Sequence, residues 1–175
     1  MRSCCHLVAA AAVLACLSCS DAAGPVTVIP VTVMSFDAVT QPEVSASGVI
    51  TGSGASAIVT ITVTVRNPDV QPRSATFIRP CTVVLHAFTS SAREGSPAFR
   101  QESLPGGCKS LAWVDTIPAR GTRTFQGQLG VGTILNPPGM PALVPGRYYF
   151  SGLISFRELP LGRIELPAGE GDLTP

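Results

Sequence analysis

Apolar and polar residues alternate most regularly between residues 59 and 65. Seven β-branched residues stand there in a row, and the apolar ones are separated by threonines: Val59, Ile61, Val63 and Val65. A period of two over β-branched residues is typical of a strand with one buried face. The turn-forming residues 67–69 follow and end the pattern.

Six further segments have shorter apolar patterns that also favour strands. They cover residues 26–33, 81–88, 111–114, 122–131, 147–156 and 164–166. Pro30 interrupts the first segment, as in an edge strand or a strand that changes sheets at a bulge. The serine-, glycine- and alanine-rich residues 45–57 are expected to form a flexible crossing.

No stretch keeps a period of 3.6 residues, and proline or glycine interrupts nearly every window long enough for a helix. About seven short strands separated by Gly/Pro-rich turns therefore predict an all-β fold. We expect an antiparallel immunoglobulin-like β-sandwich of about seven to nine strands.

The N-terminal residues follow a different pattern. Arg2 is the only charged residue before Asp21, and an apolar, alanine-rich run covers residues 7–17. The run is too short for a membrane span, which needs about 20 residues, and is typical of a secretory signal.

The end of this run, residues 16–21, resembles the lipobox of bacterial lipoproteins. There a small residue precedes a cysteine that is lipidated and becomes the new N-terminus. Ser18 fits the small position, and polar sequence starts directly after Cys19, so we expect lipid on Cys19. Cys16 is the alternative lipidation site, and plain secretion with cleavage near residues 22–23 is the alternative to lipidation.

The expected organisation is a signal peptide over residues 1–18, a tether over 19–25 and one sandwich domain over 26–175. The resemblance implies a cell-envelope location, on the periplasmic or outer-membrane face. Cleavage leaves Cys81 and Cys108 as a pair beside Cys19 in an oxidising compartment. We expect a disulfide between them, with two reduced buried thiols as the alternative.

Charge excludes some partners. Charged residues make up 13% of the chain, against about 25% in an average soluble domain. Removal of Arg2 with the signal leaves equal numbers of basic and acidic residues, and Lys109 is the single lysine. Nothing in this balance favours nucleic acid. The expected partners are the membrane, through the lipid, and another envelope protein.

Residues for catalysis are few. His86 is the one histidine left after cleavage, and odd spacing places it on the opposite strand face from Cys81. We expect His86 on the solvent face, and no catalytic residue, metal or cofactor. Three carboxylates near the C-terminus, Glu165, Glu170 and Asp172, are expected in a solvated tail. The alternative is an envelope hydrolase that uses His86 with a loop serine.

Four motifs resemble the intracellular proteinase inhibitor (BsuPI-like) family of immunoglobulin-like domains, over residues 57–156. They are Val65-Arg66-Asn67-Pro68, Pro105-Gly106-Gly107-Cys108, Ile117-Pro118-Ala119-Arg120-Gly121-Thr122 and Val144-Pro145-Gly146-Arg147-Tyr148-Tyr149. The chain departs from the family at residues 119–121, where a Pro-Gly pair is usual, and in carrying an export signal. The resemblance implies the fold and transfers no functional residues.

The sequence thus predicts a non-catalytic envelope lipoprotein that acts as a protein-binding or assembly module, with a proteinase as one partner that the resemblance implies. Its loops at residues 89–107 and 130–144 would form the contact surface. A carbohydrate-binding sandwich is a further alternative. It would use Trp113, Tyr148 or Tyr149, although the two tyrosines point to opposite faces of one strand.

Overall fold

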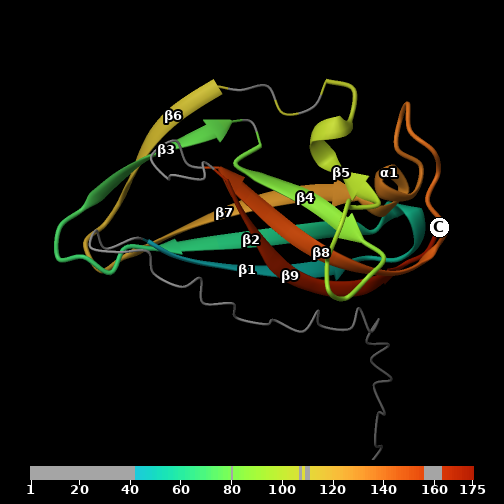
Figure 1. Ribbon diagram of the computed structural model, residues 1–175, viewed down its shortest axis with the longest axis horizontal. Coiled ribbons are helices and arrows are strands. Elements are labelled where there is room, and N and C mark those ends of the chain that lie inside the picture. The colour runs from blue at the N-terminus through green and yellow to red at the C-terminus, as the bar shows by residue number, and fades with distance from the viewer. Residues whose placement is uncertain (1–41, 80, 107, 109–110, 156–162) are drawn as a thin grey trace, which may run out of the picture.

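The computed structural model describes residues 42–79, 81–106, 108, 111–155 and 163–175 (Figure 1). Its strands are β1 (Glu43–Thr51), β2 (Ile58–Arg66), β3 (Arg73–Arg79), β4 (Val83–Phe88), β5 (Phe99–Arg100), β6 (Leu111–Ile117), β7 (Thr122–Gly130), β8 (Gly146–Ser155) and β9 (Arg163–Leu173). Its helical segments are α1 (Val131–Leu135) and two single 3₁₀ turns, η1 (Gly54–Ser56) and η2 (Gln101–Ser103). In this part of the chain no helix is long and apolar enough to cross a membrane.

The strands form two packed layers and a separate ribbon. One layer is a three-stranded sheet in the order β1-β2-β7, and the other is a four-stranded sheet in the order β5-β4-β8-β9. β3 and β6 pair with each other and extend beyond one end of the layers (Figure 1). All pairings are antiparallel. The prediction of an antiparallel β-sandwich with seven to nine strands is confirmed by the nine strands of the described residues. The orders β1-β2-β7 and β4-β8-β9 correspond to strands A-B-E and C-F-G of immunoglobulin-like folds, whereas β6, in the place of strand D, pairs with β3.

The segments expected to be strands between residues 59 and 156 lie in β2, β4, β6, β7 and β8. Four further strands differ from expectation. β1 occupies part of the expected flexible crossing, β3 and β5 correspond to no expected strand, and β9 runs eleven residues where three were expected. The expected strand over residues 26–33 lies outside the described residues. One short helix, α1, forms where none was predicted.

The core lies between the two layers and is centred on β2. The four apolar residues that alternate along β2 have 0% exposure: Val59, Ile61, Val63 and Val65. Leu85, Phe150 and Ile154 of the facing sheet are buried to the same degree. The period-two pattern of β2 therefore selects the face on which the sandwich closes.

The two layers approach most closely where one of them carries glycine. A methyl group on Gly127 of β7 would lie 2.7 Å from the carbonyl oxygen of Val83 in β4. A methyl group on Gly152 of β8 would lie 2.7 Å from Cγ2 of Ile61 in β2. Both distances are shorter than a carbon atom can tolerate, so the packing of the layers requires hydrogen at these positions.

Tyr148 fixes the entry into β8. Its side chain is buried, and its hydroxyl donates a hydrogen bond of 2.7 Å to the carbonyl oxygen of Val144. A tyrosine near the start of this strand that bonds back to upstream backbone is a hallmark of immunoglobulin-like sandwiches, called the tyrosine corner. Burial raises the pKa of the Tyr148 phenol above its ordinary value.

We predict that Gly127→Ala lowers the free energy of unfolding by about 1–3 kcal/mol, because overpacking forces the sheets apart. Urea titration measures this value. Gly130→Ala, in the same strand, is the matched control. Its backbone is extended and its nearest neighbour, Thr133 Oγ1, would lie 3.8 Å from the new methyl group. We expect a loss below about 1 kcal/mol there, and equal losses in the two variants would contradict the close contact.

A second prediction concerns alkaline pH. The pKa of Tyr148 is higher in the folded state than in the unfolded chain, where a tyrosine ionises near pH 10. Burial of the neutral phenol therefore contributes its full share to the free energy of unfolding below about pH 10. This share is lost as the pH rises above that value. Tyr148→Phe should therefore lose about 1 kcal/mol at pH 7, from the missing hydrogen bond. The variant should also show a shallower fall in melting temperature between pH 9 and 11. A wild-type slope in the variant would show that another group titrates.

Candidate functional site

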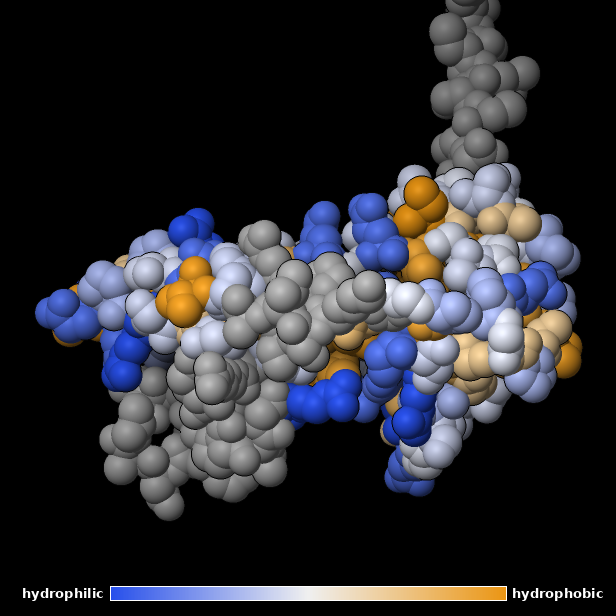
Figure 2. All heavy atoms as spheres, turned by 90° about the horizontal axis from the view of Figure 1, so that it is seen from above, coloured by the Kyte–Doolittle hydropathy of each residue, from blue (hydrophilic) through white to orange (hydrophobic). Residues whose placement is uncertain are grey.

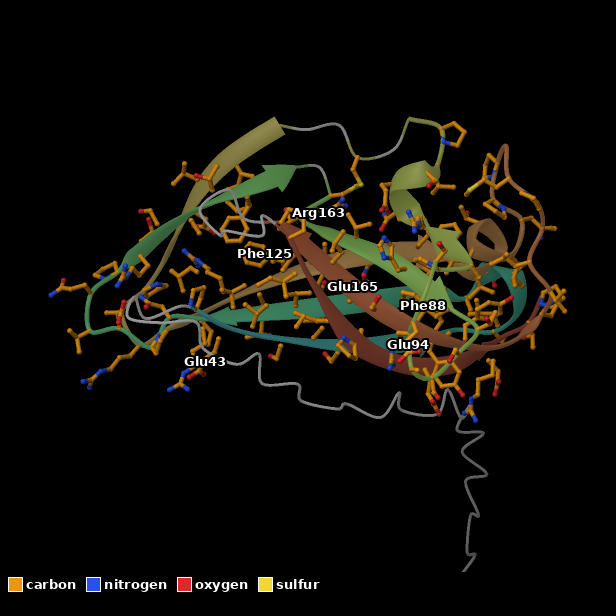
Figure 3. The ribbon with its side chains drawn as sticks, in the orientation of Figure 1. Glu43, Phe88, Glu94, Phe125, Arg163 and Glu165 are labelled. Atoms are coloured by element: carbon orange, nitrogen blue, oxygen red, sulfur yellow. A yellow bond between two sulfur atoms is a disulfide. The ribbon has the colours of Figure 1, made fainter. Side chains whose placement is uncertain are left out.

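His86 lies in β4 between two carboxylates. Its Nδ1 is 2.8 Å from Oε1 of Glu165, which is in β9, and its Nε2 is 2.9 Å from Oε1 of Glu102, which is in η2. The Arg163 guanidinium lies 3.8 Å from the same Glu102 oxygen. Figure 3 labels Glu165 and Arg163 on β9, close to β4. The cluster of His86, Glu102, Glu165 and Arg163 therefore joins three separate elements by charged contacts.

The expectation that His86 faces solvent is wrong, because its side chain is covered. The residue is 6% exposed, although it does point to the opposite face from Leu85, as the alternation requires. The cover comes from η2, which Gln101 holds in place by accepting a hydrogen bond of 2.9 Å from the backbone N–H of Leu85. η2 and β9 thus convert an outer sheet face into a buried one.

The serine nearest to this histidine is not arranged as a nucleophile. Ser151 of β8 is 1% exposed, and its hydroxyl donates to Oε1 of Glu165. A hydrolytic triad needs the hydroxyl to donate to the imidazole and to face a substrate. In the order found here Glu165 lies between Ser151 and His86, so the contacts hold the sheet together and do not activate the oxygen.

The C-terminal carboxylates are not in a solvated tail, as was expected. They lie in β9, where Glu165 contacts His86 and the other two contact Arg147 of β8. The Arg147 distances are 3.4 Å to Glu170 and 3.8 Å to Asp172. Among the described residues no three His, Cys, Asp or Glu side chains converge in a way that could hold a metal ion.

The second polar cluster lines a groove of about 580 Å³, which we call the β6/β7 groove. It opens where β6 and β7 diverge, near the start of β4. Its lining combines two aromatic rings, an acid, a base, an amide and two hydroxyls: Trp113, Phe125, Asp115, Arg123, Gln126, Thr82 and Thr124. The volume is within the range of about 300–1,000 Å³ that small-molecule sites occupy.

The aromatic wall of the groove is a packed cluster. The Phe125 ring centroid is 4.5 Å from that of Phe77 and 6.2 Å from that of Trp113. Phe77 is fully buried beneath them, whereas Trp113 and Phe125 are half-buried. Figure 3 labels Phe125 below the ribbon of β3 and β6. The Trp113 ring thus packs against Phe77, with 5.3 Å between the ring centroids, and it also lines the groove.

Cys81 and Cys108 lie at one end of the groove. Their sulfur atoms are 2.15 Å apart and their Cα atoms 5.2 Å apart, the separation of a disulfide and consistent with the pairing expected from the sequence. Cys81 directly precedes Thr82 of the groove wall, and Cys108 precedes β6. The bridge therefore ties the start of β4 to the start of β6.

Asn67 fastens the other end, where β6 turns into β7. This residue is 2% exposed, and its amide nitrogen lies 3.3 Å from the carbonyl oxygen of Ile117 and 3.2 Å from that of Pro118. Its backbone N–H donates to Gly121. Its side chain also bonds locally, donating to the carbonyl oxygen of Gln71 and accepting from the backbone N–H of Asp69, as the turn prediction implies. No local sequence signal indicates the partners some 50 residues away.

The two loops expected to bind a partner are attached to the sandwich. In the first, Arg93 donates to the carbonyl oxygens of Phe150 (3.1 Å) and Gly169 (2.9 Å), and burial lowers the pKa of its guanidinium. Tyr149 lies beneath it, 5.8 Å from ring centroid to guanidinium carbon. In the second, α1 buries Val131, Ile134 and Leu135. The sequence contains no local signal for the role of Arg93. Cys16 and Cys19 lie outside the described residues.

No protein-family model matches the chain, and no curated protein matches it significantly. Among solved structures it is similar to a β-glucosidase of saponin metabolism from intestinal bacteria, with 12% identity and a TM-score of 0.38 over 76% of this chain. It is also similar to a β-glucosidase from Erythrobacter marinus, with 13% identity and a TM-score of 0.36 over 73%. The chain spans 17% and 15% of those chains. These similarities are too low to bear on function.

We predict that His86→Leu lowers the free energy of unfolding by about 2–4 kcal/mol, since it leaves two carboxylates facing an apolar side chain. Hydrogen exchange should also become faster at residues 101–103, because η2 loses the Glu102 contact and keeps only the Gln101 bond to β4. Glu43→Ala is the control, since it breaks an exposed ion pair with Arg66 and should change stability by less than about 1 kcal/mol. Unchanged exchange at η2 in the His86 variant would contradict a role in holding that turn.

Proposed function

We propose that the protein is a non-catalytic binding or assembly module that a lipid on Cys19 holds at the bacterial cell envelope. The N-terminal pattern supports the location: one basic residue, a short apolar run, then Ser18 before Cys19 and polar sequence after it. A lipid at this position would place the domain at the membrane through the tether of residues 19–25. Cys16 and plain secretion remain the alternatives that the test must separate.

One observation supports binding over hydrolysis. Both ring nitrogens of His86 contact carboxylates, and the neighbouring Ser151 hydroxyl donates to Glu165 and not to the imidazole. Each polar group of this cluster is thus engaged in holding β4, β8, β9 and η2 together. A general base must reach the proton that it removes from the substrate. Both ring nitrogens of His86 are already in contact with carboxylates, which makes the residue a poor candidate for proton transfer.

The exposed surface favours a ligand that enters a groove over a flat apolar partner. The large apolar side chains that are exposed in the described residues are Val49, Ile58, Val70, Val114 and Val144. Val49 and Ile58 are diagonal neighbours on one face of the β1–β2 pair, and the other three lie apart in the chain. Figure 2 shows hydrophobic spheres in separate groups on the face that it displays. Contiguous apolar patches of a few hundred Å² mark many protein interfaces, and dispersed residues do not.

Metabolic labelling with an alkyne fatty acid tests the anchor. We expect the wild-type protein and Cys16→Ser to carry label and to fractionate with membranes. Cys19→Ser should lose the label and accumulate unprocessed, because the lipid acceptor is missing. Label retained in Cys19→Ser and lost in Cys16→Ser would move the site to Cys16. Absence of label from the wild type would support secretion.

Hydrolysis is tested separately with chromogenic esters and glycosides. We expect no turnover above background. Turnover that persists after purification and disappears in His86→Gln would contradict a non-catalytic role.

A further inference from the structure

We infer that the β6/β7 groove binds a neutral oligosaccharide. The inference deepens the proposed binding role, and it is independent of lipid attachment. It rests on three features of the groove: an aromatic wall, an internally paired charge, and polar side chains at its rim.

The aromatic wall suits the apolar face of a sugar ring. Trp113 and Phe125 are half-buried, so each ring is packed on one side and lines the groove on another. Pyranose rings present C–H groups on a face and hydroxyls at the edge, and aromatic side chains supply large apolar contact area at little cost in conformational entropy. A chain of sugar units would stack on the wall with its hydroxyls directed outward.

The two charged side chains of the groove, Arg123 and Asp115, form an ion pair with each other. Nε of Arg123 lies 3.5 Å from Oδ2 of Asp115 and donates to the carbonyl oxygen of Thr116 at 3.3 Å. Oδ1 of Asp115 accepts a hydrogen bond of 2.8 Å from the backbone N–H of Thr116. A charged ligand would have to break this pair and leave one partner unmatched. A neutral ligand can accept from the guanidinium and donate to the carboxylate without disturbing it.

Two polar side chains of β7 complete the rim. Thr124 and Gln126 point to the exposed face of the strand, and the Gln126 amide nitrogen donates to Oγ1 of Thr62 at 3.3 Å. This bond orients the amide, so that its oxygen is a positioned acceptor for a hydroxyl. Planar amide and carboxylate groups next to aromatic rings match the alternating polar and apolar surface of a neutral glycan.

The groove is also braced before any ligand arrives. The Cys81–Cys108 pair fixes its open end, and Asn67 fixes the turn where β6 meets β7. A site held at both ends loses little conformational entropy on binding. An extended peptide is the competing occupant, because β7 is an outer strand of its sheet and strand addition uses the backbone groups of such an edge. The contacts described above come from side chains and favour a sugar, and a peptide is therefore included in the test.

Trp113 is the single tryptophan of the chain, so its fluorescence reports on the groove directly. The full-length protein in detergent is titrated with cellotetraose, chitotetraose and maltotetraose, and separately with tetragalacturonate and an eight-residue Thr-Val peptide. We expect a saturable emission change with at least one neutral tetrasaccharide. Neither the charged sugar nor the peptide should produce one.

Variants then locate the site. Gln126→Ala should weaken the affinity about fivefold to tenfold, through loss of a hydrogen bond. Gln128→Ala, two residues along the same exposed face of β7 and outside the groove lining, should leave it unchanged. Trp113→Leu should abolish binding. Because this variant has no tryptophan, isothermal titration calorimetry measures its affinity, and circular dichroism checks that it folds. If that variant is unfolded, the glutamine pair still decides the question.

Three results would overturn the inference: no saturable change with any neutral tetrasaccharide, a change with the charged sugar or the peptide alone, or equal effects of the two glutamine variants. None of them affects the lipid-labelling result. Failure of the groove and failure of the envelope anchor are therefore distinguishable.

Discussion

The close contact between the two sheets is the constraint on which the other features depend. At Gly127 and Gly152 one layer lies directly against backbone or β-branched side chains of the other, with no room for a methyl group. β2 presents branched apolar residues to the interior, and two of them, Ile61 and Val63, lie against Gly152, while Val83 of β4 lies against Gly127. The position of β7 against β4 is thereby fixed.

The groove follows from that position. β7 stays with the sandwich because Gly127 is packed on Val83, while β6 leaves it to pair with β3. Two strands that are consecutive in sequence therefore diverge, and their separation must be stabilised by other contacts. Asn67 does this at the turn, where its amide reaches carbonyl groups of the β6–β7 connection, and the cysteine pair does it at the far end. A polar and aromatic space remains between the strands.

The sequence predicts those strands whose own side chains form the core. β2 is the clearest, because burial of one face imposes a period of two. β1 and β9 are different: Ser45, Ala46 and Gly48, or Pro167 and Gly169, have little strand preference. They are extended because β2 and β8 supply hydrogen-bonded ladders to them. His86 shows the same limit for sites, since its face on β4 was predictable, whereas its cover by Glu102 and Glu165, 16 and 79 residues away, was not.

The chain has few charged residues, and many of those in the described part are engaged in contacts within the domain. Several of its few ionic groups are engaged within the domain: Arg93 on backbone carbonyls, Glu102 and Glu165 on His86, and Asp115 with Arg123. Groups engaged in this way produce little net field, so long-range attraction of a charged partner is weak. Recognition at the proposed site would then rely on short-range shape, stacking and hydrogen bonds, in a groove whose two ends are held in place. A lipid anchor would be compatible with such recognition, since it would set the location of the domain without any contribution from surface charge.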